Sequence, residues 1–366
     1  PPVRFFDRHG KSLLQGQQVT VYTHADLKDL EYTPSKQTVQ RATFNTQGAA
    51  ELTISAKVFV MCMGGIENAR MLLYFNQKYD DQLGNQSGKV GKYFMEHPTP
   101  RAAHIMTDVP ETFDLYKMSM VDSRGIVGFF SLTEHALRQE QTTNLRIPLI
   151  PNTKFHMSEG ISSSHILRNS LSQGELPDEW GHHIANVLSD LDMVVEGIAR
   201  KKFDKKVFED ADKIAGFTSP MMMEQTPEER NQIRLGTSKD RNGIPRVTID
   251  YRVSDDDKNR VWKSLKVVSK ELNLHNIGRL RMLKHRADRL WGDQLGFSNH
   301  HMGTTRMSEN PDTGVVDKQQ RVFGTDNLFV AGSSVFCTGG HVPPTLTICA
   351  TTVRLAEYLS KEYASV

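Results

Sequence analysis

The chain has 366 residues, 38% of them hydrophobic, and a formal net charge of +2. This length and composition exclude a disordered or fibrous protein and allow two lobes with a large core. No stretch approaches the roughly 20 consecutive apolar residues of a membrane-spanning helix. The near-neutral charge gives no indication of nucleic-acid binding.

The cysteines and the start of the chain add further bounds. Cys62, Cys337 and Cys349 form no C-x-x-C pair, so we predict neither a disulfide framework nor a metal site. The sequence contains no signal peptide, which leaves a cytoplasmic and a periplasmic location both open. The chain begins at Pro1 without an initiating methionine, so we expect a piece of a longer or processed protein.

The first third of the chain predicts an α/β arrangement. Residues 4–15 predict a short helix, and the alternating apolar positions within residues 18–27 predict a half-buried strand. Residues 56–63 form a continuous apolar run, which is typical of a strand covered on both faces. This run meets Gly64 and Gly65 and continues into a helical pattern. Such a strand, turn and helix can bind a nucleotide, and the pattern equally fits a tight turn in any α/β protein.

The middle of the chain changes character. Short strand patterns at residues 126–130, 144–147 and 246–251 alternate with polar linkers and predict an antiparallel sheet that lines a pocket. Residues 183–198 place apolar side chains on one face of a predicted helix. A second helix is predicted to begin at Ser254, which is followed three residues later by an acidic residue.

The last seventy residues hold the strongest candidates for chemistry. Residues 299–307 pair two histidines with a glycine turn, a strand pattern follows at residues 328–332, and a helix is predicted from Thr345. Imidazole, with an ordinary pKa of about 6.5, is suited to taking a proton from an alcohol at neutral pH. An imidazole, a glycine-terminated strand and a helix N-terminus can converge on one flat, electron-accepting ligand.

Three segments of this region occur together in a known family. HHMGTTRM, NLFVAGSSVF and PPTLTICA, in this order and spacing, resemble the C-terminal part of the glucose-methanol-choline (GMC) flavin oxidoreductases, and most of all their bacterial sugar-dehydrogenase branch. The resemblance implies FAD as cofactor. It also implies an α/β FAD-binding lobe, Rossmann-like but incomplete, and an α+β substrate domain with an antiparallel sheet. The lobe would comprise residues 1–95 and 300–366, and the substrate domain residues 96–299.

The resemblance also implies roles for single residues. His300 stands in the H-x-x-G-T pattern of the family's catalytic histidine and would act as general base while hydride passes to flavin N5. The positions that match cofactor contacts in the family are Leu27, Gly64, Gly65, Asn68, Gly332, Ser333, Pro344 and Thr345.

Two features depart from the family pattern. The dinucleotide fingerprint G-x-G-x-x-G does not occur in these residues, so we expect a preceding segment or a second polypeptide to complete the FAD site. The family position usually filled by Asn or His falls on Pro343, whose side chain can neither donate nor accept a hydrogen bond. His341, two residues earlier, is the imidazole expected to replace it beside His300.

The sequence therefore predicts an FAD-dependent dehydrogenase or oxidase that acts on a hydroxyl group of a sugar or other polyol. Its partners would be that substrate and an electron acceptor, which a second polypeptide could supply. The alternative is a degenerate, non-catalytic flavoprotein-like subunit with a binding or structural role, which the absent fingerprint and Pro343 favour.

Overall fold

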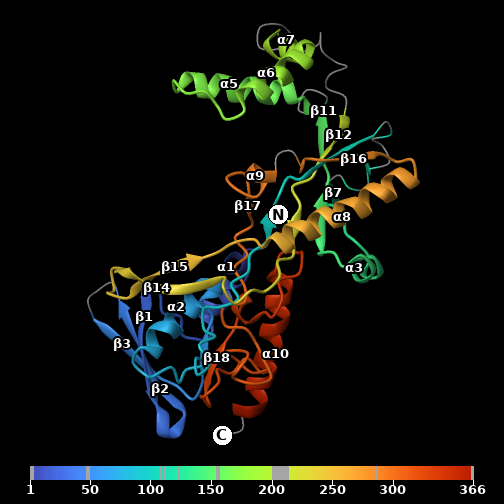
Figure 1. Cartoon of the computed structure of the whole chain (residues 1–366). Coiled ribbons are helices and arrows are strands. Elements are labelled where there is room, and N and C mark those ends of the chain that lie inside the picture. Colours follow the sequence, from blue (N-terminus) through green and yellow to red (C-terminus); the bar gives the residue numbers. More distant parts are fainter. Residues whose placement is uncertain are drawn as a thin grey trace.

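The structure is a computed structural model that describes residues 4–46, 50–107, 109, 113–114, 116, 118–122, 124–153, 157–199, 214–284 and 287–363. Figure 1 shows that the two ends of the chain, in blue and in red, fold together in the lower part of the view. Most of the green and orange segments between them form the upper part, whereas the yellow strands of residues 232–250 lie lower, beside the blue segments. The chain therefore leaves its first region, touches it again with these strands, and returns to it at its end.

The first region combines a small antiparallel sheet with helices and a parallel strand pair. Its elements from the start of the chain are α1 (Phe5–Gln15), β1 (Ala25–Thr33), the 3-10 turn η1 (Pro34–Lys36), β2 (Thr38–Thr46), β3 (Glu51–Ser55), β4 (Phe59–Met61) and α2 (Gly64–Asn76). Its elements from the end of the chain are β18 (Leu328–Val330), the 3-10 turn η5 (Ser333–Val335) and α10 (Thr345–Tyr363). β1, β2 and β3 pair antiparallel in that order, and β18 pairs in parallel with β4.

One core joins the two chain ends in this region. Leu72 and Phe75 on α2 and Leu328 on β18 are at most 1% exposed and belong to the same hydrophobic cluster as Leu30 on β1. Burial of each such side chain stabilises the fold by about 1.5–3 kcal/mol. The parallel pair is therefore held by side-chain packing as well as by its own hydrogen bonds.

The second region is built from short antiparallel strands and one long helix. Its strands are β5 (Pro98–Thr99), β6 (Ala103–Met106), β7 (Ser119–Val121), β8 (Arg124–Ile126), β9 (Phe129–Phe130), β10 (Leu145–Pro148), β11 (Ile150–Thr153), β12 (Ile214–Thr218), β13 (Met222–Met223), β14 (Gln232–Lys239), β15 (Pro245–Asp250), β16 (Arg279–Met282) and β17 (Gly296–Phe297). Its helices are α3 (Glu134–Glu140), α5 (Glu159–Ser172), α6 (Trp180–Ser189), α7 (Leu191–Ala199), α8 (Asp255–Leu274) and α9 (Ala287–Leu290).

The strands of this region form antiparallel sheets, as the sequence predicts. The largest has the order β11-β12-β6-β16, and a three-stranded sheet has the order β13-β10-β9. Ser254 caps the N-terminus of α8, and its hydroxyl accepts a hydrogen bond from Asp257 N–H. α8 buries Val261 and Leu265 in a core shared with β10. The prediction of a mixed α/β protein with antiparallel sheets is confirmed. None of the described helices is long and apolar enough to cross a membrane.

Three sequence predictions of single elements are wrong. The strand predicted for residues 18–27 begins only at Ala25, because His24 has a φ of +57° and no described strand pairs with the residues before it. β4 is not covered on both faces, since Val60 is 40% exposed. The helix predicted for residues 183–198 is divided at Asp190, whose carboxylate accepts hydrogen bonds from Ser158 Oγ and Gly160 N at the start of α5.

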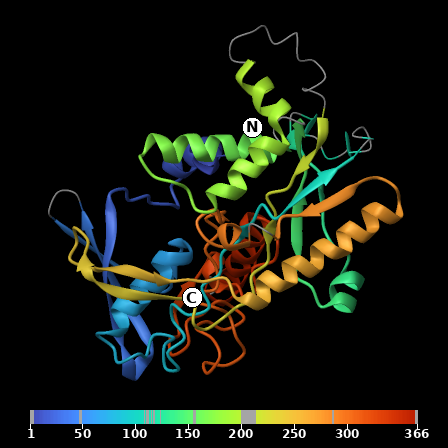
Figure 2. The same cartoon turned by 45° about the horizontal axis from the view of Figure 1, so that its top comes forward.

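The helices α5, α6 and α7 pack on one another and lie at the top of the molecule in Figure 1. In Figure 1 they lie far from α10, and in Figure 2, where they come forward, they lie apart from the yellow β14–β15 hairpin. This position leaves Leu188 and Val195 more than half exposed, although their spacing is that of a buried helical face.

The β14–β15 hairpin ties the second region to α2 of the first. Arg70 on α2 donates to Pro245 O at 2.7 Å and to Asp240 Oδ2 at 2.5 Å, and it also pairs with Glu67 at 2.9 Å. The Arg70 side chain is only 11% exposed and that of Asp240 20%, so water does little to screen their attraction. This contact fixes how the hairpin lies on the helix.

We expect Arg70→Ala to lower the free energy of unfolding by about 3 kcal/mol, because it leaves the half-buried Asp240 carboxylate without its cation. Urea denaturation followed by circular dichroism measures this change. Arg138→Ala is the matched control, since Arg138 and Glu134 form an exposed pair on α3 with side chains 79% and 78% exposed. Its expected loss is below about 1 kcal/mol. Equal losses in the two variants would contradict the assigned role of Arg70.

Candidate functional site

The candidate site is centred on the loop of residues 299–303, which backbone hydrogen bonds hold from two sides. Met302 and Met95 exchange two N–H···O bonds, both of 3.0 Å. Gly303 N–H donates to Ser333 O at 3.2 Å. Gly303 has a φ of +85°, and a Cβ there would lie 2.4 Å from Tyr93 O, so the turn needs glycine. The loop therefore has a fixed position between the segment before β5 and the η5 turn.

A buried carboxylate organises the histidines of this loop. Glu96 is 4% exposed, and its Oε1 accepts hydrogen bonds from the backbone N–H groups of His97 at 2.7 Å and His300 at 2.8 Å. Its Oε2 lies 3.6 Å from Nε2 of His301. Gln225 accepts the N–H of Glu96 itself at 3.2 Å. One side chain thus links the two histidine-bearing segments, which lie 204 residues apart in the sequence.

His97 and His300 form a hydrogen-bonded pair of imidazoles. Their Nδ1 atoms are 3.0 Å apart, and the rings meet edge to face. On its other side, Nε2 of His97 lies 2.9 Å from Gly340 O and 3.1 Å from Gly339 O. Because carbonyl oxygens only accept, Nε2 of His97 must carry a proton.

This arrangement fixes the tautomer of His300. A neutral His97 with its proton on Nε2 has an unprotonated Nδ1, which accepts a hydrogen bond. His300 Nδ1–H must then donate to it, and Nε2 of a neutral His300 keeps a free lone pair. Among the described residues, none forms a hydrogen bond with His300 Nε2. The hydrogen-bond network therefore presents His300 as a base at one defined atom.

The surroundings keep both rings neutral near pH 7. Burial lowers the pKa of His97, and the neighbouring His300 lowers it further, against the backbone carbonyls that raise it. Burial also lowers the pKa of His300, and the negative charge of Glu96 opposes that shift. A neutral imidazole is the form that can accept a proton, so His300 is in the competent state at neutral pH.

Five of the residues predicted to hold the cofactor meet around the start of α2. Gly65 touches the histidine loop so closely that a Cβ would lie 2.2 Å from His301 O. Ser333 Oγ donates to the same carbonyl at 2.6 Å. Asn68 is fully buried; its amide donates to Ala331 O and Ser334 Oγ, and its Oδ1 accepts from Met63 N–H. Asn68 therefore holds α2 against the turn after β18.

The glycines of this cluster leave room for a flat ligand. Gly64 has a φ of +83°, and no atom lies within 4 Å of where its Cβ would be. Gly332 has a φ of +118°, with only Asn68 Nδ2 at 4.0 Å. A ligand can therefore approach the backbone directly at both glycines, which suits the dinucleotide that the sequence predicts.

The segment that leads into α10 contacts His97 of the His97–His300 pair. Gly339 and Gly340, which hold His97, directly precede His341 in the chain. His341 Nε2 is 3.4 Å from Ser131 Oγ, its ring lies edge-on to Phe129, and burial lowers its pKa. No hydrogen bond joins His341 to His300 in the described part of the chain. Pro344 is buried and Thr345, the first residue of α10, is exposed.

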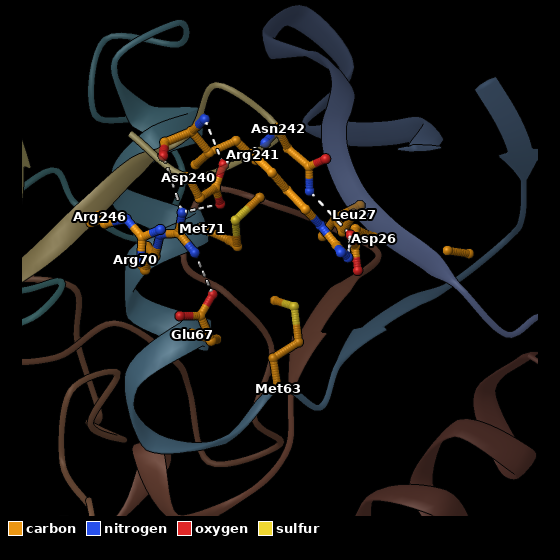
Figure 3. A pocket seen from close by; sticks show the side chains of 12 residues that line it. Asp26, Leu27, Met63, Glu67, Arg70, Met71, Asp240, Arg241, Asn242 and Arg246 are labelled. Carbon is orange, nitrogen blue, oxygen red and sulfur yellow. Dashed lines mark hydrogen bonds and ion pairs between the residues drawn. The ribbon is translucent and has the colours of Figure 1, made fainter. Parts of the chain in front are cut away.

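Leu27 lies away from the histidines, in a cavity of about 510 Å³ between β1, the start of α2 and the β14–β15 hairpin. Figure 3 shows Leu27 and Met63 at this cavity, with Asp26 bonded to Arg241 and Asn242 across it. The Arg241 bond is the main reason why the pKa of Asp26 is lowered. Met63 directly precedes α2, so the cavity adjoins the cluster around Gly64 and Asn68.

Comparison with known proteins identifies the C-terminal part of the chain. Residues 227–352, which include both His300 and His341, match the model of the GMC oxidoreductase family. This part of the chain is similar to the GMC oxidoreductases. The family assignment from the sequence is confirmed, and with it FAD as the cofactor of the family and oxidoreduction as its chemistry.

The similarity extends over nearly the whole chain. The 2-methyl-1,2-propanediol dehydrogenase of Mycolicibacterium austroafricanum is 27% identical over 94% of this chain and 55% of its own length. The fructose dehydrogenase large subunit of Gluconobacter japonicus is 23% identical over 89% of this chain and 51% of its own length. Pyridoxine 4-oxidase from Mesorbium loti shares the fold, with a TM-score of 0.55 and 14% identity over 96% of this chain and 60% of that one. The chain thus spans about half the length of these curated relatives.

Sequence reasoning missed Glu96 and His97. The dipeptide was visible before Pro98, but neither residue belongs to the three segments that carry the family resemblance. A buried acid beside a histidine is a recognisable signal only when the partner is known, and that partner lies 203 residues later. In the described ranges, no group of three or more His, Cys, Asp or Glu side chains could hold a metal ion.

We expect Glu96→Gln to lower the pKa of His300. The charge of Glu96 raises that pKa, so removing the charge while keeping an amide oxygen as acceptor leaves burial to act alone. The histidine ring protons, followed by NMR as a function of pH, report the change. Glu224→Gln is the matched control, since Glu224 binds Gly340 N–H and does not contact His300. A raised or unaltered His300 pKa in Glu96→Gln would contradict the assignment.

The tautomer of His300 gives an independent prediction. Ring ¹⁵N shifts of the neutral form should show a proton on Nδ1 and none on Nε2, because Nδ1 must donate to His97. His97→Phe removes the acceptor and should abolish this preference. An unprotonated Nδ1 of His300 in the unaltered protein would mean that His97 is the donor and His300 the acceptor, which would contradict the assigned tautomer.

Proposed function

We propose that the protein oxidises a hydroxyl group of a sugar or other polyol with FAD, and that His300 is the general base. The observation that carries this proposal is the free Nε2 of His300, the one ring nitrogen of the His97–His300 pair that the hydrogen-bond network leaves without a proton or a partner. Removal of a hydroxyl proton needs such an atom. The similarity to 2-methyl-1,2-propanediol dehydrogenase and to a fructose dehydrogenase subunit supports an alcohol or a sugar as the substrate class.

The surroundings of His300 favour the charge that proton uptake creates. When Nε2 accepts the substrate proton, the ring becomes a cation with both nitrogens protonated. Nδ1–H continues to donate to His97, and the carboxylate of Glu96 lies beside the ring as a counter-charge. These groups are already in place before the reaction, so the charge is stabilised without reorganisation. His97 and Glu96 act through His300 and are positioning residues.

FAD, when bound, would accept the hydride at flavin N5. We propose that Gly64, Gly65, Asn68, Gly332 and Ser333 form its backbone cradle, where open space at Gly64 and Gly332 supports close approach. α2 begins without a side-chain cap, so its first N–H groups remain available to an anion. This cradle would belong to a Rossmann-like lobe of residues 1–95 and 300–366, with residues 96–299 as the substrate domain.

The two ends of the cofactor would be held by different parts of that lobe. Leu27, in the cavity of Figure 3, would contact the adenine. Pro344 and Thr345 would lie at the flavin, where the N-terminus of α10 carries roughly half a positive charge. That partial charge would stabilise negative charge on the reduced ring.

His341 would assist His300 with the substrate hydroxyl, and its contacts with Phe129 and Ser131 of the substrate domain support this role.

The second candidate function is a non-catalytic flavoprotein-like subunit, which Pro343 favours because the side chain of that exposed residue can form no hydrogen bond. A subunit architecture, with an electron acceptor or a further FAD-binding segment on another polypeptide, is supported by the similarity to the fructose dehydrogenase large subunit.

In the FAD-loaded enzyme, His300→Ala should slow flavin reduction by about 10²–10⁴-fold, the usual contribution of a general base. Stopped-flow absorption measures the rate, and the flavin spectrum before mixing shows that FAD is still bound. His275→Ala, at an exposed position after α8, is the control and should react at the normal rate. Bound flavin that no polyol reduces, even in the unaltered protein, would support the non-catalytic alternative.

A further inference from the structure

Arg146 is the one charged residue in the strands of the sheet β13-β10-β9. It lies on β10, the central strand, between Leu145 and Ile147, which are at most 1% exposed and face the core. Successive side chains of a strand point to opposite faces, so Arg146 points away from that core. A cation at this position needs an explanation, because packing alone would favour an apolar residue.

Arg146 has no anionic partner among the residues that the structure describes. Its guanidinium lies 5.0 Å from the centre of the Phe129 ring, and Nε is buried without a hydrogen-bond acceptor. No described carboxylate pairs with it, whereas Arg70, Arg138, Arg234 and Arg241 all pair with one. Buried donors are normally satisfied. A buried N–H without an acceptor on a charged side chain therefore points to a ligand that supplies one.

The guanidinium lies on the His341 side of the site. Burial is the main reason why the pKa of His341 is lowered, and the positive charge of Arg146 lowers it further. The pKa of His300 is lowered first by burial, and Arg146 adds to that shift after the effects of Glu96 and His301. Phe129 contacts both Arg146 and the His341 ring. His341 follows Gly339 and Gly340, whose carbonyls accept the Nε2–H of His97. Arg146 is therefore connected through Phe129 to the segment that holds the His97–His300 pair.

We propose that Arg146 binds the carboxylate of the substrate, so that the enzyme acts on a polyhydroxy acid rather than on a neutral polyol. The inference rests on the proposed function and names its substrate class. A guanidinium can donate two parallel hydrogen bonds to a carboxylate, and the unpaired Nε is one of the five donors of that fork. The single positive charge matches a monoanion, since His300 and His341 are neutral near pH 7.

The test compares an acid and an alcohol with the same carbon skeleton, D-gluconate and D-glucitol, in the FAD-loaded enzyme. Binding of each is measured from the change in flavin absorption on mixing, and kcat/KM is added for any compound that is oxidised. The unaltered enzyme should bind D-gluconate more tightly. In Arg146→Gln, the preference for the acid should fall about 10²-fold, the usual cost of removing one partner of a buried charged pair.

Two further variants keep the result interpretable. Arg146→Lys retains the charge but loses the planar fork, so it should keep only part of the preference, and it decides the matter if Arg146→Gln does not fold. Arg138→Gln, on the exposed face of α3, should keep the preference of the unaltered enzyme. An acid preference that is absent at the outset, or equal in Arg146→Gln, overturns the proposal.

The outcome is distinguishable from failure of the proposed function. If flavin reduction depends on His300 but the acid preference does not depend on Arg146, only the carboxylate site is wrong. If the acid preference depends on Arg146 but reduction is insensitive to His300, the catalytic proposal is wrong and the binding site stands. D-glucitol 6-phosphate is a third ligand, and tighter, more Arg146-dependent binding of this phosphate than of D-gluconate would overturn the choice of a carboxylate.

Discussion

The site depends on one buried carboxylate oxygen that accepts two backbone N–H groups from distant parts of the chain. Glu96 Oε1 binds the N–H of His97 and that of His300, and this bond sets where the two imidazoles meet. A buried charge is costly unless it is fully hydrogen-bonded, so the surrounding backbone is strongly constrained to satisfy it. The positions of the two imidazoles are thus determined by the hydrogen bonds that this buried carboxylate requires.

The second consequence of this arrangement is chemical. His97 is held by two carbonyls on one side and by His300 on the other, so its protonation state fixes the tautomer of its neighbour. The carbonyls belong to Gly339 and Gly340, just before the segment that leads into α10. Three separate stretches of sequence therefore define the state of a single nitrogen atom. Such a network responds as a unit, because the proton position on one ring determines the proton position on the other.

The relative placement of the two regions rests on different contacts. The β4–β18 pair joins the ends of the chain through a shared core, whereas Arg70 binds the β14–β15 hairpin through a half-buried ion pair and two carbonyls. The first contact is apolar and insensitive to charge. The second is specific in direction and fixes one wall of the cavity in Figure 3, which α2 and the hairpin both line. The cavity and the cluster around Gly64 and Asn68 therefore share α2 as a common support.

The sequence by itself determined the local features whose causes are local. It identified the glycine turn at Gly64 and Gly65, the helix capped by Ser254 and the antiparallel character of the middle region. It also identified the family whose model covers His300. Periodicity, capping residues and short motifs each depend on residues that are close in the sequence. Only the tertiary structure decided what joins distant segments. It supplied His97 and Glu96, the unpaired Arg146 and the break at Asp190, since each depends on a partner that sequence separation conceals.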